Sequence, residues 1–297
     1  MKRKFTLSRA LIWIFCSAIF VNASFFLCIR GYRYWKQTCT IDYKVPIRAI
    51  VQTGPQKEAL KTTYLAELLG LSVDQPILSS DFDLKQANLS LLLSPIIKEA
   101  DVKFKEPGIL YVDYVIRQPM CFLYDFENIA LDAQRVPFPV TPFFSPKRLP
   151  EIYLGMRNSL IWNQPITGKK IELAFDLLKI LEGPIVCDLF NVKRIDVSLA
   201  FEKSCGRREI VLMTEDEIFF PQKEREVRFA FPRLLRLSLK NYRQELSNYL
   251  KIREQLLEKE QVRLEFPEGG EKKVIFPQKV LDFRIPQIAF IENQGGK

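Results

Sequence analysis

A stretch of 20 residues without a charged side chain, residues 10–29, constrains this sequence more than any other feature. It reads ALIWIFCSAIFVNASFFLCI, and a helix that rises about 1.5 Å per residue would carry it across the roughly 30 Å hydrocarbon core of a bilayer. Four basic residues and no acidic residue precede it, and basic flanks tend to stay on the cytoplasmic side. We therefore expect an uncleaved membrane anchor that places the body of the chain on the far side.

The same segment has two other interpretations. A basic start, an apolar run and the small residues around Val21-Asn22-Ala23 also resemble a cleaved secretory signal peptide. The apolar run continues through residues 25–29, which is further than a signal peptide needs. A buried core helix of a soluble protein is the third interpretation. The anchor and the signal peptide both export the remaining residues.

The formal charge of +9 is concentrated near the N-terminus. Residues 1–36 hold seven Lys or Arg and no Asp or Glu, so the rest of the chain carries 37 basic against 35 acidic side chains. A nucleic-acid-binding surface needs a large basic excess, and the body has almost none. The hydrophobic share of 47% is enough for the cores of one or two domains. We therefore expect the lipid bilayer, and no nucleic acid, as a partner.

The residue types that carry most hydrolytic and metal chemistry are sparse. The sequence has no histidine, which removes His-activated nucleophiles and His-bearing metal sites. No cysteines form a C-x-x-C pair, and no glycine-rich nucleotide motif occurs. We expect no catalytic residue, cofactor, metal site or small-molecule substrate. An oxidising compartment could pair some of Cys39, Cys121, Cys187 and Cys205, but their wide spacing favours single buried thiols over a disulfide framework.

Hydrophobic periodicity predicts a small α+β unit after the apolar segment. Apolar residues alternate through residues 109–116, as in a half-buried strand, and recur three and four apart in two helical patterns. Gly70 is placed to end the first helix, and Ser80-Asp81 to cap the second. The expected order is strand 47–52, helix 58–69, helix 80–93, strand 102–105 and strand 109–116.

The remainder is predicted as β-rich with a few helices. Five prolines within residues 137–150 exclude a central strand or helix interior there, which leaves an extended edge segment or connector. A proline-rich recognition ligand is the alternative for this segment. The other expected elements are strands 120–124 and 128–131, helix 171–181, strands 195–201, 209–213 and 217–220, a hairpin around residues 268–270, and a last strand 280–291.

Residues 215–217 and 233–261 show two further patterns. Three consecutive acidic residues at 215–217 are typical of a solvated turn. Apolar residues recur every seven positions from Leu235 to Leu256, which predicts one long helix. Arg253 interrupts the second apolar row, so an amphipathic helix lying on a sheet is favoured over a coiled coil.

Six short segments, taken in order, resemble those of the FtsQ/DivIB family. These are bitopic cell-division proteins with a basic cytoplasmic tail, one membrane helix, an exported POTRA domain and a β-rich second domain. The matching segments are IVQTG (residues 50–54), SPIIKEADV (94–102), KEPGIL (105–110), RQP (117–119), LPEIYLG (149–155) and LDFR (281–284).

This resemblance implies a division of the whole chain. It assigns a cytoplasmic tail (1–9), a transmembrane helix (10–29), a juxtamembrane segment (30–45), a POTRA domain (46–118) and a β-rich α+β domain (119–297). It also implies a non-enzymatic scaffold of the septal peptidoglycan machinery, in the inner membrane at the division septum. The implied partners are membrane proteins of the divisome, namely an FtsB–FtsL-like pair and components of the septal synthase.

The resemblance further implies that the last strand accepts a partner strand through main-chain hydrogen bonds. The residues alone allow a second interpretation, in which the apolar members are core and Arg284 forms an internal salt bridge rather than pairing an acid of the partner. The residues predicted to bind the partner are Val280, Leu281, Asp282, Phe283, Arg284, Ile285, Ile288 and Phe290.

Two other functions are compatible with parts of this pattern. A POTRA-bearing adaptor of a secretion or outer-membrane assembly system would share the first exported unit, but the ten-residue alternating strands of a barrel are missing from the sequence. A membrane-anchored cell-wall hydrolase would need two carboxylates in a suitable setting. The acidic residues are numerous, but none stands alone in an apolar stretch that would raise its pKa.

Overall fold

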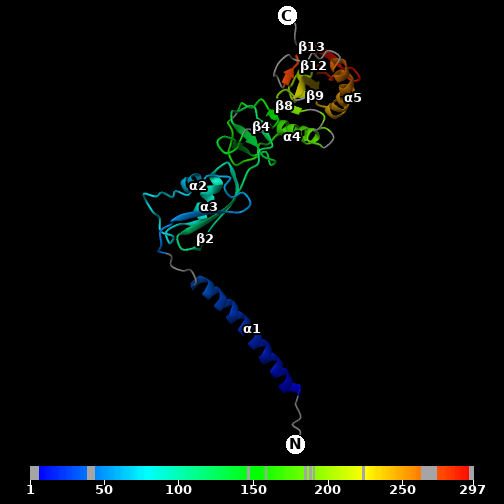
Figure 1. Ribbon diagram of the computed structural model, residues 1–297. Helices are drawn as coiled ribbons and strands as arrows, with labels where there is room; N and C mark the ends of the chain where they lie inside the picture. Colours follow the sequence, from blue (N-terminus) through cyan, green and yellow to red (C-terminus); the bar gives the residue numbers. More distant parts are fainter. Residues whose placement is uncertain are drawn as a thin grey trace.

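The computed structural model of the chain is a mixed α+β structure, an N-terminal helix followed by a sheet-rich body (Figure 1). It describes residues 7–38, 44–145, 148–157, 159–183, 186, 189, 191–222, 225–261 and 273–293. The predicted α+β class is therefore confirmed.

Helix α1 (Leu7–Thr38) contains the uncharged stretch. Within it, Phe15–Arg33 is long and apolar enough to cross a membrane, and none of this span is buried inside the protein. Phe20 and Phe26 expose most of their side chains, so the interpretation of this segment as a core helix is wrong. The amide of Asn22 donates a hydrogen bond to the Ala18 carbonyl at 2.8 Å, which satisfies part of its polarity within the helix.

A three-stranded unit follows, with the predicted β-α-α-β-β order. It consists of β1 (Ala49–Thr53), α2 (Thr62–Leu68), α3 (Leu84–Leu93), β2 (Ile97–Glu106) and β3 (Ile109–Ile116). The sheet order is β1-β3-β2, with β1 parallel and β2 antiparallel to the central strand. Leu110, Val112, Tyr114 and Ile116 of β3 are all buried, so the alternation predicted for this strand is confirmed.

Local side-chain contacts set the helix boundaries of this unit. Helix α2 is shorter than predicted because the Glu58 amide donates to Gln52 and the Leu60 amide to the Tyr114 hydroxyl, which keeps this turn out of the helix. Gly70 follows the helix at φ +65°, as its predicted role requires. The cap of α3 is Asp83, whose carboxylate accepts from two amides of the first turn, and not Ser80-Asp81.

The rest of the chain forms a ten-stranded sheet. Its strands are β4 (Cys121–Leu123), β5 (Ile129–Leu131), β6 (Pro137–Pro139), β7 (Glu151–Tyr153), β8 (Asn191–Asp196), β9 (Ile210–Gln222), β10 (Arg225–Leu237), β11 (Lys273–Ile275), β12 (Lys279–Asp282) and β13 (Phe290–Asn293). Their order is β13-β12-β10-β9-β8-β7-β4-β5-β6, and β11 also pairs with β10. The hairpin of β4 and β5 and the edge position of the proline-rich β6 are confirmed.

Two helices cover the core of this sheet. Helix α4 (Lys169–Leu181) buries Leu177 and Leu178, and helix α5 (Tyr242–Gln261) buries Leu246 and Tyr249 against residues of β8, β9, β10 and β12. At the far end of the sheet, Phe138 of β6 packs with the helices of the three-stranded unit. The two sheets therefore share one continuous stretch of core at that end.

Several predicted elements in the second half are wrong. The strand predicted at 195–201 contributes only its first two residues to β8 (Asn191–Asp196), and residues 198–201 form turns. Strands 209–213 and 217–220 are one strand, β9, so residues 215–217 are not a turn. Residues 233–237 belong to β10 because they alternate between buried and half-exposed and pair with β9, and the helix begins only at Tyr242. The last strand is two strands, β12 and β13, joined by a turn at residues 285–287. The predicted hairpin around residues 268–270 lies outside the described residues.

Candidate interaction surface

The residues predicted to bind a partner strand are divided between two strands and a turn. Val280, Leu281 and Asp282 lie in β12, which pairs with β10 on one side and β13 on the other. β12 is therefore not an edge strand. Phe290 lies in β13, which ends the sheet. Of the predicted edge strand 280–291, only the segment that includes Phe290 lies at an edge.

Burial separates the same residues into core and surface. Leu281 and Phe283 belong to the core under α5, where the Phe283 ring lies 6.3 Å from the Tyr249 ring, centroid to centroid. Ile285, Ile288 and Phe290 are 50%, 51% and 54% exposed. Only these last three present apolar side chains to solvent.

Arg284 is occupied within the chain. Its guanidinium pairs with Asp282 at 2.7 Å and with Glu209 at 3.2 Å, and Arg236 contacts the same two carboxylates. Burial alone would raise the pKa of Asp282, but its hydrogen bonds to Arg284 hold that pKa below its ordinary value. The internal salt bridge, which was the alternative interpretation of this arginine, is therefore confirmed.

A groove lies beside Ile285 and Ile288. It has a volume of about 710 Å³, and its walls come from α5 and from residues 283–289. Asn248 and Ile252 contribute on the helix side, and Ile285 and Ile288 on the other. The groove thus combines polar amides with aliphatic side chains, as ligand-binding clefts do.

Strand β13 completes this surface. Residues 290–293 pair with β12, and among the described residues no strand pairs with the opposite side of β13. Such an edge presents unpaired N–H and C=O groups to an incoming chain. We call the β13 edge, the three exposed residues and the groove the C-terminal surface.

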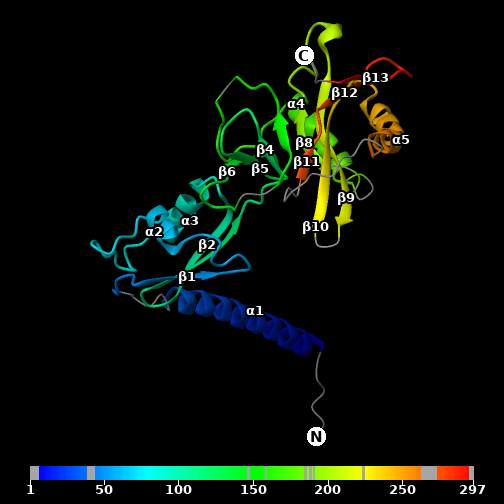
Figure 2. The same ribbon diagram turned by 45° about the horizontal axis from the view of Figure 1, so that its top comes forward.

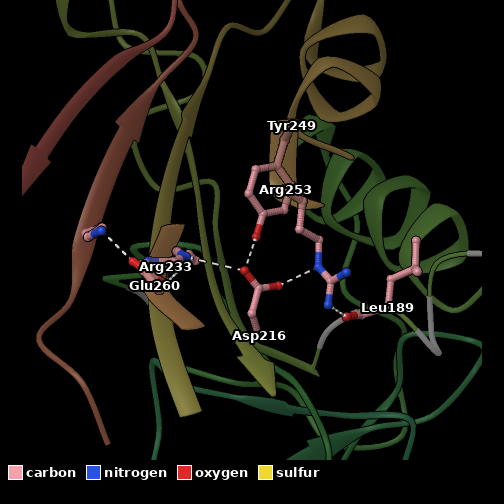
Figure 3. Close-up of polar contacts among 7 residues, drawn as sticks. Leu189, Asp216, Arg233, Tyr249, Arg253 and Glu260 are labelled. Atoms are coloured by element: carbon pink, nitrogen blue, oxygen red, sulfur yellow. Dashed lines mark hydrogen bonds and ion pairs between the residues drawn. The ribbon is translucent and has the colours of Figure 1, made fainter. Parts of the chain in front are cut away.

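A buried network of charges supports the sheet behind this surface (Figure 3). Asp216 of β9 is fully buried and accepts from Arg233 at 3.3 Å, from the Tyr249 hydroxyl at 2.9 Å and from Arg253 at 2.7 Å. Burial and the charge of Asp216 raise the pKa of Tyr249, so this hydroxyl stays protonated and donates.

The network continues through Glu260, the last acidic residue of α5. Arg233 donates to Glu260 at 3.1 Å, and Lys279 of β12 pairs with the same carboxylate. Burial alone would raise the pKa of Glu260, but the hydrogen bonds from Arg233 and Lys279 lower it. β9, β10, α5 and β12 are thus tied together by compensated charges, and because no solvent reaches Asp216, we assign the network a structural role.

Sequence reasoning missed this network, although one signal of it was present. Arg253 interrupts an apolar row of the helical pattern, and a charge on a core-facing row needs a buried counter-charge. That counter-charge is Asp216, 37 residues earlier in the chain.

We looked for metal-binding groups and reactive thiols in the described part of the chain. It holds no group of three His, Cys, Asp or Glu side chains placed to bind a metal ion. Cys121 is a free, buried thiol, and burial raises its pKa to about 12, so it stays protonated and unreactive. The structure does not describe the side chains of Cys39, Cys187 and Cys205.

Comparison with known proteins adds no family assignment. No model of a known protein family matches the sequence, and no curated protein is significantly similar to it.

Proposed function

We propose that this protein is a single-pass, membrane-anchored scaffold that binds an extended segment of a partner protein at its C-terminal surface. The observation that carries the proposal is the β13 edge, flanked by the half-exposed Ile285, Ile288 and Phe290 and by the 710 Å³ groove. An added strand would pair with the main chain of β13, while its side chains reach the groove.

We further propose that the scaffold is non-catalytic and acts in cell division as an FtsQ/DivIB-like protein with a POTRA domain. Three observations support this: the apolar helix at the N-terminus, the β-α-α-β-β unit after it, and the sheet whose last strand is open. Its partners would be an FtsB–FtsL-like pair and the septal synthase, at the inner membrane, with the body in the periplasm.

The structure changes one part of the binding mechanism. Because Arg284 already pairs with Asp282 and Glu209, it does not supply a free charge to the partner. Affinity would then come from main-chain hydrogen bonds and from burial of the three exposed apolar side chains, at roughly 25 cal/mol per Å² of apolar surface removed from water.

The test is co-purification of the full-length protein with the FtsB–FtsL-like pair expressed in the same membrane. Ile288→Asp and Phe290→Asp place a charge on the apolar surface, and we expect each to abolish capture of the pair. Val73→Asp is the matched control because Val73 is almost fully exposed on the three-stranded unit.

The proposal fails if both variants fold and retain the pair as well as the control does. A protease-protection assay on intact cells tests the topology separately. The body should be digested from the periplasmic side, with the N-terminal tail protected.

A further inference from the structure

Strand β9 has a free edge that the sheet does not use. β8 pairs with β9 as far as Glu215, whereas β10 continues along β9 to Gln222. Residues 216–222 are therefore paired on one side, and among the described residues no strand pairs with them on the other. Figure 2 shows β9 and β10 running side by side.

The buried charge network also holds one of the described residues that precede β8. Arg253 uses its Nε to bind Asp216 at 2.7 Å and its Nη2 to bind the carbonyl of Leu189 (Figure 3). Leu189 lies two residues before the start of β8 at Asn191. The arginine thus ties the main chain of Leu189 to α5, beside the point where the β8–β9 pairing ends at Glu215.

Proline fixes which backbone groups of the free edge point outward. Pro232 of β10 has no N–H and is paired with Glu215, so this is a non-hydrogen-bonded pair of the β9–β10 ladder. Since such pairs alternate along the strand, Glu217 and Phe219 also direct their N–H and C=O groups away from β10. Pro221 directs only its carbonyl outward. In agreement, Glu215 pairs outward with Asn191 of β8.

The side chains along this edge favour association over repulsion. Phe219 is 51% exposed, and the Arg228 guanidinium lies 5.6 Å from its ring centroid. A charged side chain on an edge strand discourages pairing with another chain, but Glu217 is neutralised by its ion pair with Arg228 of β10. The edge therefore presents an apolar ring and a compensated charge.

We propose that residues 216–222 of two copies of this chain pair antiparallel about a two-fold axis at Phe219. In this register Phe219 lies opposite Phe219 of the second copy and exchanges two hydrogen bonds with it. Glu217 lies opposite Pro221, and its N–H donates to the proline carbonyl in each copy. Because Pro221 has no N–H, the Glu217 carbonyl of each copy receives no hydrogen bond in return. No carboxylate lies opposite another carboxylate in this register.

The free length and its central residue fit a second copy of the chain. Seven residues are open, and Phe219 is the central one, so two identical edges cover each other completely without reaching Asn191. The arrangement buries the exposed Phe219 ring against its own symmetry mate, as isologous interfaces do. Helix α1, long enough to span a membrane, would concentrate the copies in one plane and favour so small an interface.

This self-association goes beyond the proposed function and does not use the C-terminal surface. β13 and the free part of β9 are different edges, separated in the sheet by β12 and β10. A dimer formed at β9 leaves the β13 edge of each copy available. Its failure would therefore leave the scaffold proposal standing.

The test uses the full-length protein in phosphatidylethanolamine–phosphatidylglycerol vesicles, with donor or acceptor fluorescent proteins fused to the N-terminus. Energy transfer between copies reports the dimer. Phe219→Pro removes the outward N–H without touching the β9–β10 ladder, in which Pro221 and Pro232 already occupy equivalent positions. We expect it to weaken the dimer about tenfold, because two hydrogen bonds are lost across the two-fold.

A second variant and a control separate the contributions. Phe219→Thr keeps the N–H and removes the ring, so it should weaken the dimer less than proline does. Leu89→Thr alters an equally exposed apolar residue on α3 and should leave energy transfer unchanged. Far-ultraviolet circular dichroism and thermal melting verify that each variant is folded.

Photo-cross-linking identifies the occupant directly. Benzoylphenylalanine at position 219 should give a covalent homodimer in membranes. The proposal is overturned if wild-type energy transfer equals that of randomly mixed proteins at the same density, if folded Phe219→Pro leaves it unchanged, or if position 219 cross-links only to a different protein.

Discussion

The two ends of the ten-stranded sheet differ in almost every property that governs an edge strand. At one end, β6 is built from Pro137, Phe138 and Pro139, and Phe138 is fully buried among residues of the three-stranded unit. At the other end, β13 contains no proline, and Phe290 is 54% exposed. At the β6 end, prolines and a buried ring prevent a further strand from pairing. At the β13 end, neither proline nor packing among the described residues prevents it. We call them the closed end and the open end.

The difference shows how one sheet can be an internal support and a binding surface at once. The prolines of β6 remove main-chain donors from this edge. The core that β6 shares with α2 and α3 excludes water from the Phe138 ring. The buried Arg117–Asp132 ion pair, at 2.7 Å, adds a polar contact beside that core. Among the described residues, nothing comparable covers the C-terminal surface, so its apolar side chains can make intermolecular contacts.

Asp216→Ala should have the largest effect, because it tests what holds the open end in place. The substitution leaves Arg233 and Arg253 buried without their shared counter-charge, which should cost about 3–5 kcal/mol of unfolding free energy. Chemical denaturation measures this loss. Hydrogen exchange should accelerate first in α5 and β12, whereas β5 and β6 keep their protection.

A surface ion pair supplies the control for that experiment. Asp101 pairs with Lys103 at 2.8 Å, but both side chains are about half exposed or more. Asp101→Ala should leave the denaturation midpoint unchanged. If Asp216→Ala behaves like Asp101→Ala, the buried network does not support the open end.

Alanine at the two phenylalanines tests the comparison most directly. Phe138→Ala should cost about 3–4 kcal/mol, because it empties a fully buried site in the core shared by the two sheets. Phe290→Ala should cost less than about 1 kcal/mol, because half of that ring is already in water. Denaturation midpoints of the two variants measure the difference, and equal losses would show that the two ends are packed alike.

The closed end and the three-stranded unit are the parts that the sequence predicts well. Their signals are local, and each determines the structure of its own segment: the alternation in β3, Gly70 after α2 and the prolines of β6. Helix α4 also follows its apolar periodicity, beginning two residues before the predicted start.

The open end was predicted poorly because its signals depend on distant residues. Asp216 lies inside a strand only because Arg233 and Arg253 neutralise it, and no pattern within a few residues reveals that. Leu235 falls in register with the apolar row of α5 by chance, so strand and helix merged into one predicted helix. The turn at Pro286 divides the last strand and moves the edge from β12 to β13.

Glu260→Gln should give a smaller loss that depends on pH. The pKa of Glu260 is lowered in the folded protein, so its carboxylate stabilises the fold above its ordinary value near 4.5 and loses this contribution as pH falls through the lowered pKa. The variant should lose roughly 1–2 kcal/mol at neutral pH. As the pH falls from 4.5 through the lowered pKa, the stabilities of variant and wild type should converge. Denaturation midpoints between pH 3 and pH 7 measure this, and parallel curves would contradict it.

Arg284→Ala should have the smallest effect on stability and no effect on partner capture. It tests which residues of the open end support the surface and which contact the partner. Arg284 pairs with Asp282 and Glu209 while about a quarter of its side chain meets solvent, so its loss should cost about 0.5 kcal/mol. Ile288→Asp should show the opposite behaviour, with an unchanged midpoint and lost capture, because its side chain is half exposed beside the groove. Measuring both quantities for both variants separates residues that hold the surface from residues that form it. If Arg284→Ala abolishes capture while the protein keeps its stability, the arginine contacts the partner, and its internal ion pairs must break on binding.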